Sequence, residues 1–265
     1  MTALTTTSLA ATAPATRRLP GPVHYTLSAL RLTTRNPGYL IFTIGLPVAM
    51  YLVFNGIWGG EQVVPGVNYS ALLMVQMAAY GSLGAALSGG AIIAVERRSG
   101  WFRQLMLTPI PARSFLLARA LVVLVIVLPS LLLVFGTGLI LGVRAPVGTW
   151  FASLGLMWLS LLPLTALGMV IGLVVKNEAV QGLNTVVLLV LSLAGGLWFP
   201  IQLMPAAMQT IAKFLPSYWI GEFGRWPFLD DPFPWVGVLV LAGWALAGVG
   251  LGALGYRRAA RDSKR

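Results

Sequence analysis

Few side chains in this sequence could perform catalysis. Acid–base or metal chemistry needs carboxylates, histidines or cysteines gathered at one site, and the chain has seven carboxylates, one histidine and no cysteine. We expect every carboxylate to lie in a loop or tail, with His24 at the membrane interface or capping a helix. The carboxylates are Glu61, Glu96, Glu178, Glu222, Asp230, Asp231 and Asp262. The sequence therefore predicts no catalytic residues, no metal site and no enzyme.

ATP binding by this chain is also not expected. A phosphate-binding P-loop requires a Gly-Lys-Ser/Thr sequence, so that backbone amides and the lysine surround the phosphates. The three lysines follow valine, alanine and serine, and no Gly-Lys pair exists. If ATP drives this protein, ATP and Mg²⁺ are bound by a separate partner chain, and this chain holds no cofactor.

The elements that position these residues are membrane helices. Hydrophobic residues make up 57% of the chain, charged residues make up 9%, and the mean hydropathy is +0.84. Soluble domains carry roughly 25% charged residues. Backbone groups in lipid must be satisfied within their own segment, and the runs lack the alternation of a barrel. We expect an all-α polytopic membrane protein.

Six apolar runs predict six transmembrane helices. Small residues recur four apart in three runs and predict close helix packing, as at Gly90, Gly168 and Gly172. Pro47, Pro129 and Pro163 predict kinks. The runs cover residues 39–57, 70–95, 115–142, 150–175, 180–199 and 234–256.

The N-terminal region is expected to precede the spans on one side of the membrane. Residues 1–21 have neither a basic start nor an apolar core, and we interpret them as a disordered cytoplasmic tail. Residues 22–265 form the predicted transmembrane domain. Val23 to Arg35 reads as an amphipathic helix on the membrane surface, ended by Asn36-Pro37-Gly38.

The charge distribution predicts the topology. The net charge is +11, and most lysines and arginines lie in the tail, the 96–113 loop, the 176–178 loop and the C-terminus. The opposite side has only Arg144, Lys213 and Arg225. We expect a multi-pass protein of the inner or plasma membrane with both termini cytoplasmic, and Arg119 snorkelling to the cytoplasmic edge. This topology accounts for the charge without nucleic acid.

Polar residues at membrane depth bear on how transport is driven. Ion-coupled transporters place ionisable residues near the bilayer centre, and this chain has none there. Gln76 and Asn184 could line a translocation path or form interhelical hydrogen bonds. A self-contained secondary transporter or channel remains an alternative of another class.

The 96–113 loop concentrates charge between two apolar runs. If residues 97–107 form a helix, Trp101, Phe102, Leu105 and Met106 fall within an arc of roughly 140 degrees. Such a stripe needs a groove on another protein, or a membrane surface, to cover it. Arg98 does not fit the pattern. The alternative is a basic loop that only sets topology and rests on lipid headgroups.

A second unusual segment runs from Gly195 to Trp219. It contains three prolines, and Met204, Met208, Ile211 and Leu215 recur at helical spacing. The segment is too short and too polar to span. We expect a short re-entrant or extracellular helical segment in the outer leaflet.

Two motifs resemble those of ABC type-2 permeases, the membrane subunits of ATP-binding-cassette exporters. The first is E-R-x-x-G-x-x-x-x-L-x-x-x-P, formed by Glu96, Arg97, Gly100, Leu105 and Pro109. The second is G-G-x-W-F-P-x-x-x-x-P, from Gly195 to Pro205. Arg98 departs from the family pattern, in which many relatives carry a second acid. The resemblance covers nearly the whole chain.

The resemblance implies two copies of an ATPase subunit and a second permease copy, with a homodimer favoured over a heterodimer. The 96–113 loop would couple to the ATPase, and residues 200–232 would form an extracellular lid. The implied coupling residues are Glu96, Arg97, Gly100, Trp101, Phe102, Leu105 and Pro109. The implied lid residues are Trp198, Phe199, Pro200, Met204, Pro205 and Pro216.

The substrate is expected to be a hydrophobic or amphipathic small molecule of the antibiotic or drug type, because the predicted path has few polar groups. The ERRSGWFRQLMLTP sequence looks closest to drug and natural-product exporters, which implies a role in antibiotic resistance. A permease for a lipid or lipid-linked glycan is the alternative.

Overall fold

The computed structural model describes residues 41–64, 67–99, 112–176, 178–199, 201–229 and 231–262. The predicted tail and the amphipathic helix from Val23 to Arg35 lie outside the described residues. So do residues 100–111, which include most of the predicted coupling motif.

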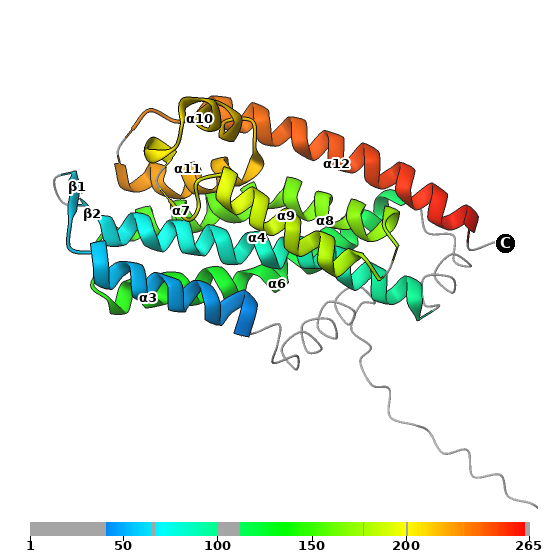
Figure 1. Cartoon of the computed structure of the whole chain (residues 1–265), viewed down its shortest axis with the longest axis horizontal. Helices are drawn as coiled ribbons and strands as arrows, with labels where there is room; N and C mark the ends of the chain where they lie inside the picture. The colour runs from blue at the N-terminus through cyan, green and yellow to red at the C-terminus, as the bar shows by residue number, and fades with distance from the viewer. Residues whose placement is uncertain are drawn as a thin grey trace, which may run out of the picture.

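The described chain is a helical bundle with one small hairpin (Figure 1). Strands β1 (Gln62–Val64) and β2 (Val67–Asn68) pair antiparallel, and in sequence they lie between helices α3 and α4. The helical elements are η1 (Ile41–Gly45, a π-helical turn), α3 (Leu46–Trp58), α4 (Tyr69–Arg98), α6 (Ala112–Ile140), α7 (Val147–Ser160), α8 (Leu162–Val174), α9 (Val180–Ala194), η2 (Ile201–Leu203, a 3₁₀ turn), α10 (Ala206–Ala212), α11 (Pro216–Leu229) and α12 (Trp235–Asp262).

Each of the six predicted runs contains an apolar helix, but the helices differ in length. Four segments of the described chain are long and apolar enough to cross a membrane: Tyr69–Arg98, Leu117–Ile140, Val147–Val174 and Trp235–Tyr256. The segments Thr43–Trp58 and Val180–Ala194 are shorter apolar helices. The chain is therefore a multi-pass membrane protein built from helices.

Helix α4 lies at the centre of the bundle. It packs most extensively against α6 and α8, and it also contacts α3, α9 and α11. Its middle is almost entirely buried, with Met74, Met77 and Leu83 fully enclosed in the main core. A helix that is apolar or small on every face is the kind that a bundle interior accepts.

The predicted close packing of small residues is confirmed at the contact between α4 and α8. A Cβ atom built on Gly90 would lie 2.1 Å from the carbonyl oxygen of Gly168. A Cβ on Gly172 would lie 2.3 Å from the carbonyl oxygen of Gly90. The two backbones therefore touch directly, and only glycine fits at these positions.

The fourth predicted span corresponds to one segment of membrane-crossing length, Val147–Val174, which is interrupted between α7 and α8. Helices α7 and α8 are separated by a turn at Leu161, and Pro163 lies in the first turn of α8. Proline is tolerated there because the first backbone amides of a helix have no intrahelical partner. The halves have different neighbours, since α7 packs mainly against α11 and α8 against α4 and α12.

The bundle is elongated and has two distinct ends along its long axis (Figure 1). Figure 1 shows the β1–β2 hairpin, α10 and α11 at one end, and the C-terminal ends of α4 and α12 at the other. We call these the lid end and the loop end, because the second adjoins residues 100–111.

Candidate functional site

Arg97, in the last turn of α4, is hydrogen-bonded to the end of α8. Its Nη1 atom donates to the carbonyl oxygen of Gly172 at 2.9 Å and to that of Val175 at 3.1 Å. Carbonyl groups at the C-terminus of a helix lack intrahelical partners and carry partial negative charge. Arg97 therefore caps α8 from the neighbouring helix.

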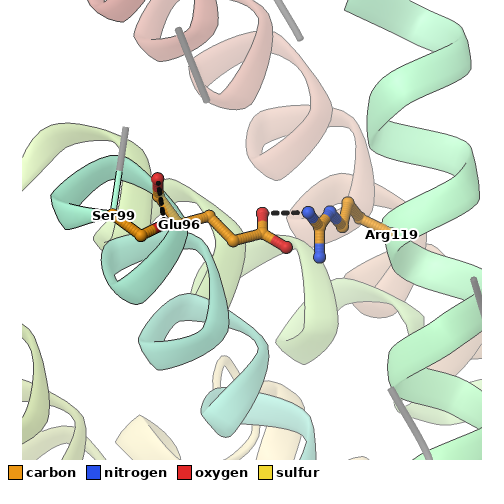
Figure 2. A network of polar contacts seen from close by, with 3 residues as sticks. All are labelled: Glu96, Ser99 and Arg119. Carbon is orange, nitrogen blue, oxygen red and sulfur yellow. Dashed lines mark hydrogen bonds and ion pairs between the residues drawn. The ribbon is translucent and has the colours of Figure 1, made fainter. Parts of the chain in front are cut away.

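Glu96 pairs with Arg119 on the other side of α4 (Figure 2). The guanidinium of Arg119, on α6, donates to Glu96 Oε2, and the two side chains are 6% and 15% exposed. Ser99 closes the turn by donating from its hydroxyl to the carbonyl oxygen of Glu96 at 3.1 Å. Two buried charges of opposite sign offset much of each other's desolvation cost.

Two sequence-based expectations are wrong at this point. Glu96 does not lie in a loop, because α4 continues to Arg98, and the loop between α4 and α6 is shorter than 96–113. Arg119 does not snorkel to the membrane edge; it is 5% exposed and turned toward Glu96. The buried carboxylate gives the guanidinium a partner inside the bundle.

The polar groups described at the loop end join helices to one another. They hold α4 to α6 and to α8, at the positions where the described chain leaves for residues 100–111. Gly100, Trp101, Phe102, Leu105 and Pro109 lie outside the described residues. Their assignment to coupling stays a prediction.

At the lid end, Gly195 and Gly196 shape the chain after α9. A Cβ on Gly195 would lie 2.3 Å from the Ser217 hydroxyl, which itself donates to the carbonyl oxygen of Leu191 at 2.7 Å. Gly196 has a φ of +71°, a conformation that favours glycine. The two glycines of the second motif therefore turn the chain tightly against α11.

The aromatic residues of the motif face different surroundings. The ring of Trp198 packs edge-on against Tyr80 of α4, with centroids 5.6 Å apart. Phe199 is 49% exposed. Pro200 lies outside the described residues. The lid end therefore contacts the central helix through Trp198.

Helix α10 is shorter than the sequence pattern indicated. It covers only Ala206–Ala212, so Met204 and Leu215 fall outside it, and Pro205 precedes its first residue. Gln209 donates from its side chain to the carbonyl oxygen of Met204 at 2.8 Å and closes the preceding turn. Prolines at both ends limit the helix to this length.

The exposed side of the lid end is apolar. Trp244 of α12 donates from its indole nitrogen to the carbonyl oxygen of Phe214 at 2.8 Å, which holds the segment against α12. Large side chains that face outward here are Leu203, Met208, Ile211 and Phe214, with exposed fractions of 78%, 37%, 55% and 67%.

Sequence reasoning missed α11. This helix begins at Pro216 and packs on α7 and α4, and Ser153 of α7 donates to the carbonyl oxygen of Gly224 at 2.7 Å. Its buried Trp219, Ile220 and Phe223 recur at helical spacing, a signal that could have found it.

The charges of α11 are internal to the helix. Glu222 forms an ion pair with Arg225 one turn later, and both side chains are partly buried. Burial raises the pKa of Tyr218 to about 12, and the neighbouring Glu222 carboxylate adds to the rise. Glu222 is therefore engaged within the lid end, and it does not lie in a loop.

Gln76 and Asn184 lie in the core of the bundle. Asn184 of α9 donates from Nδ2 to the carbonyl oxygen of Leu87 on α4 at 3.0 Å, and Gln76 is 3% exposed. Asn184 thus forms an interhelical hydrogen bond, one of the two roles expected for it. Their placement on a translocation path stays a prediction.

The described residues hold no group of three or more histidine, cysteine or acidic side chains that could ligate a metal ion. Several polar contacts of the described bundle join helices to one another, as at Glu96, Arg97 and Asn184.

Comparison with known proteins agrees with this arrangement. The family model described as ABC-2 type transporter matches residues 25–229. A protein of Bacillus subtilis called "Putative transport permease YvfS" is 29% identical over 224 residues, which cover 83% of this chain and 90% of that protein. A protein of Mycobacterium tuberculosis called "Probable doxorubicin resistance ABC transporter permease protein DrrC" is 30% identical over 252 residues, 88% of each. The chain therefore belongs to the ABC-2 type transporter family and is a membrane permease of an ABC transporter.

Proposed function

We propose that this chain is the permease of an ABC exporter that moves a hydrophobic or amphipathic, drug-like molecule out of the cell. One observation supports export driven by a partner chain above the others. The polar contacts at the loop end tie α4 to α6 and α8 beside residues 100–111. A displacement of that loop is thereby passed to three membrane helices.

The choice of substrate class rests on chemistry and on one relative. The M. tuberculosis relative is named for doxorubicin resistance, and doxorubicin is a planar amphipathic cation. Several outward-facing residues of α9, which an exported molecule or a second copy could contact, are apolar, among them Val186, Leu189 and Val190. Such surfaces suit molecules with extended apolar area.

The partners follow from the absence of a P-loop in the sequence. We propose that two copies of an ATPase subunit bind ATP and Mg²⁺ and dock at the loop end, and that two copies of this chain form a homodimer. Trp101, Phe102 and Leu105 would anchor the loop in the ATPase, with Gly100 and Pro109 bounding the anchor.

The proposed topology has six crossings. Helix α3 with its preceding π-helical turn, and α9, extend over roughly 25 Å and 22 Å at the usual helical rise. The hydrocarbon core is about 30 Å thick, so both fit with some local thinning or with their flanking turns. Both termini and the loop end would face the cytoplasm, and residues 200–232 would close the path outside.

The test is export from vesicles. The chain is reconstituted in vesicles with a candidate P-loop ATPase from a neighbouring gene. A fluorescent amphipathic cation and ATP are placed on the side that carries the ATPase, and a hydrolysis-deficient ATPase serves as control. The proposal expects ATP-dependent movement of the dye that the control lacks. Movement of a fluorescent lipid-linked glycan, but not of the dye, would replace the substrate class. Transport driven by an ion gradient without the ATPase would overturn the proposal.

A further inference from the structure

Two neighbouring residues at the end of α4 contact two different helices. Glu96 reaches α6 through Arg119, and Arg97 reaches the last turn of α8 through the carbonyl groups of Gly172 and Val175. We propose that Glu96 and Arg97 are positioning residues that fasten α4, α6 and α8 into one rigid unit at the loop end. We call these contacts the clasp; the inference rests on the proposed function, in which residues 100–111 transmit motion.

The helical period explains why Glu96 and Arg97, although adjacent in sequence, contact different helices. Successive residues of an α-helix are rotated by roughly 100 degrees, so residues 96 and 97 point to neighbouring helices that flank α4. The contacts to the two helices are therefore divided between one acidic and one basic residue of the family motif, Glu96 and Arg97. Both side chains turn toward the bundle, so their first partners are within this chain.

The contact between α4 and α8 is fixed at two points. Gly90 touches Gly172 backbone to backbone, and Arg97, roughly two turns further along α4, binds the carbonyl oxygen of the same Gly172. One close contact alone would let the helices pivot about it. The second attachment removes that rotation, so α8 follows α4.

The contact between α4 and α6 is fixed by charge. Close packing of apolar side chains resists sliding in part, and the ion pair adds a directional contact to it. Separating Glu96 from Arg119 is costly, since it leaves two charges in a medium of low dielectric. The pair therefore sets the register of α6 against α4.

Arg98 provides the contrast. It follows Arg97 in the same turn and carries the same charge, yet its side chain is exposed. The same substitution at residues 97 and 98 thus compares a partly buried cap with an exposed cation. If the clasp exists, substitution of Arg97 changes the α4–α8 distance and the coupling to ATP hydrolysis, and substitution of Arg98 changes neither.

The chain has no cysteine, so spin labels can be placed without removing native thiols. Val95, Leu117 and Val174 are exposed residues at the loop ends of α4, α6 and α8, with exposed fractions of 65%, 65% and 54%. Cysteines at Val95 and Val174 report the distance from α4 to α8. Cysteines at Val95 and Leu117 report the distance from α4 to α6. A single cysteine at Leu203 in each permease copy reports the lid end.

The experiment measures these label distances in the full transporter, without nucleotide and with ATP trapped on a hydrolysis-deficient ATPase. We expect the α4–α8 and α4–α6 distances of the unsubstituted chain to be the same without nucleotide and with trapped ATP. In Arg97→Gln the α4–α8 distance changes with ATP, and in Glu96→Gln the α4–α6 distance does. Arg98→Gln behaves as the unsubstituted chain.

A second readout separates positioning from mere folding. Molecules exported per ATP hydrolysed should fall roughly tenfold in Arg97→Gln, a typical size for coupling between sites, while ATPase binding is kept. Arg97→Lys, which retains a cationic donor, should recover most of the loss. If Arg97→Gln does not assemble, the lysine variant and the distances in the unsubstituted chain still decide the matter.

Failure of the clasp and failure of the proposed function look different. Loop-end distances that change with ATP in the unsubstituted chain, together with a change at Leu203, would overturn the clasp alone. So would Arg97→Gln and Glu96→Gln variants that keep constant distances and full coupling. An absence of any ATP-dependent change at Leu203, with no retained ATPase, would overturn the proposed function instead.

Discussion

Glu96 at the end of α4 and Arg119 of α6 form an ion pair buried between the two helices. Each side chain offsets part of the free energy that burial of the other costs. Removing one charge from a buried pair leaves the other uncompensated, whereas replacing both by apolar residues of similar size is often neutral. Single and double substitutions can therefore separate two effects of the ion pair. One is its effect on the stability of the protein, and the other is its effect on the position of α6 along α4.

Stability is the first prediction. Glu96→Met or Arg119→Met alone should lower the free energy of unfolding by about 3–5 kcal/mol, because each breaks the ion pair between α4 and α6. The double variant should recover most of that loss. Unfolding of the purified chain in detergent, followed by denaturant titration, measures all three. Equal losses in the single and double variants would show that the charges do not compensate each other.

The glycine contact between α4 and α8 gives the second prediction. Gly172→Ala places a Cβ 2.3 Å from a backbone oxygen, which cannot move aside. We expect the helices to separate and the yield of folded chain to fall. Gly182→Ala on α9 is the matched control, since a Cβ there meets nothing within 4 Å. Size-exclusion profiles of the two variants test this, and a folded Gly172→Ala chain would contradict the contact.

The turn after α9 gives the third prediction. Gly196 has a φ of +71°, and a residue with a Cβ pays roughly 1–2 kcal/mol in this region. Gly196→Ala should therefore destabilise the chain by about that amount and loosen Trp198 from Tyr80. The melting temperature measures the first effect and tryptophan fluorescence the second. Gly60→Ala, an open position near the hairpin, should change neither signal.

The lid end gives the fourth prediction. Met204→Asp introduces a charge beside the short helix α10 and should impair export without loss of assembly, if residues 200–232 close the path. Gln202→Asp, at an exposed neighbouring position, is the control. Dye efflux and recovery of the complex are measured together. Unaffected efflux in Met204→Asp would argue against a lid at this position.

The apolar pattern predicted helices well, because a helix in lipid must be long and apolar whatever its neighbours are. Small residues four apart likewise predicted the contact of Gly90 with Gly168 and Gly172, since close approach depends on the absence of a side chain. The two motifs that begin at Glu96 and Gly195 predicted the family, and the match to the family model confirmed it.

Side-chain partners could not be predicted in the same way. Glu96 sits at the end of an apolar run, where a loop residue and a buried ion-pair partner have the same local sequence. Only the packing of α6 beside α4 brings Arg119 to it. The break at Leu161 was hidden for a similar reason, because Pro163 is compatible both with a kink and with the start of a new helix.

We propose that an ATPase drives this permease through the residues that follow Arg97. The most direct test of this proposal is ATP-dependent dye efflux by the reconstituted transporter carrying Trp101→Ala and Leu105→Ala. We predict that the membrane domain of this variant still folds and dimerises, while efflux and substrate-stimulated ATP hydrolysis are lost. Unchanged ATPase recovery, hydrolysis and efflux in this variant would contradict it.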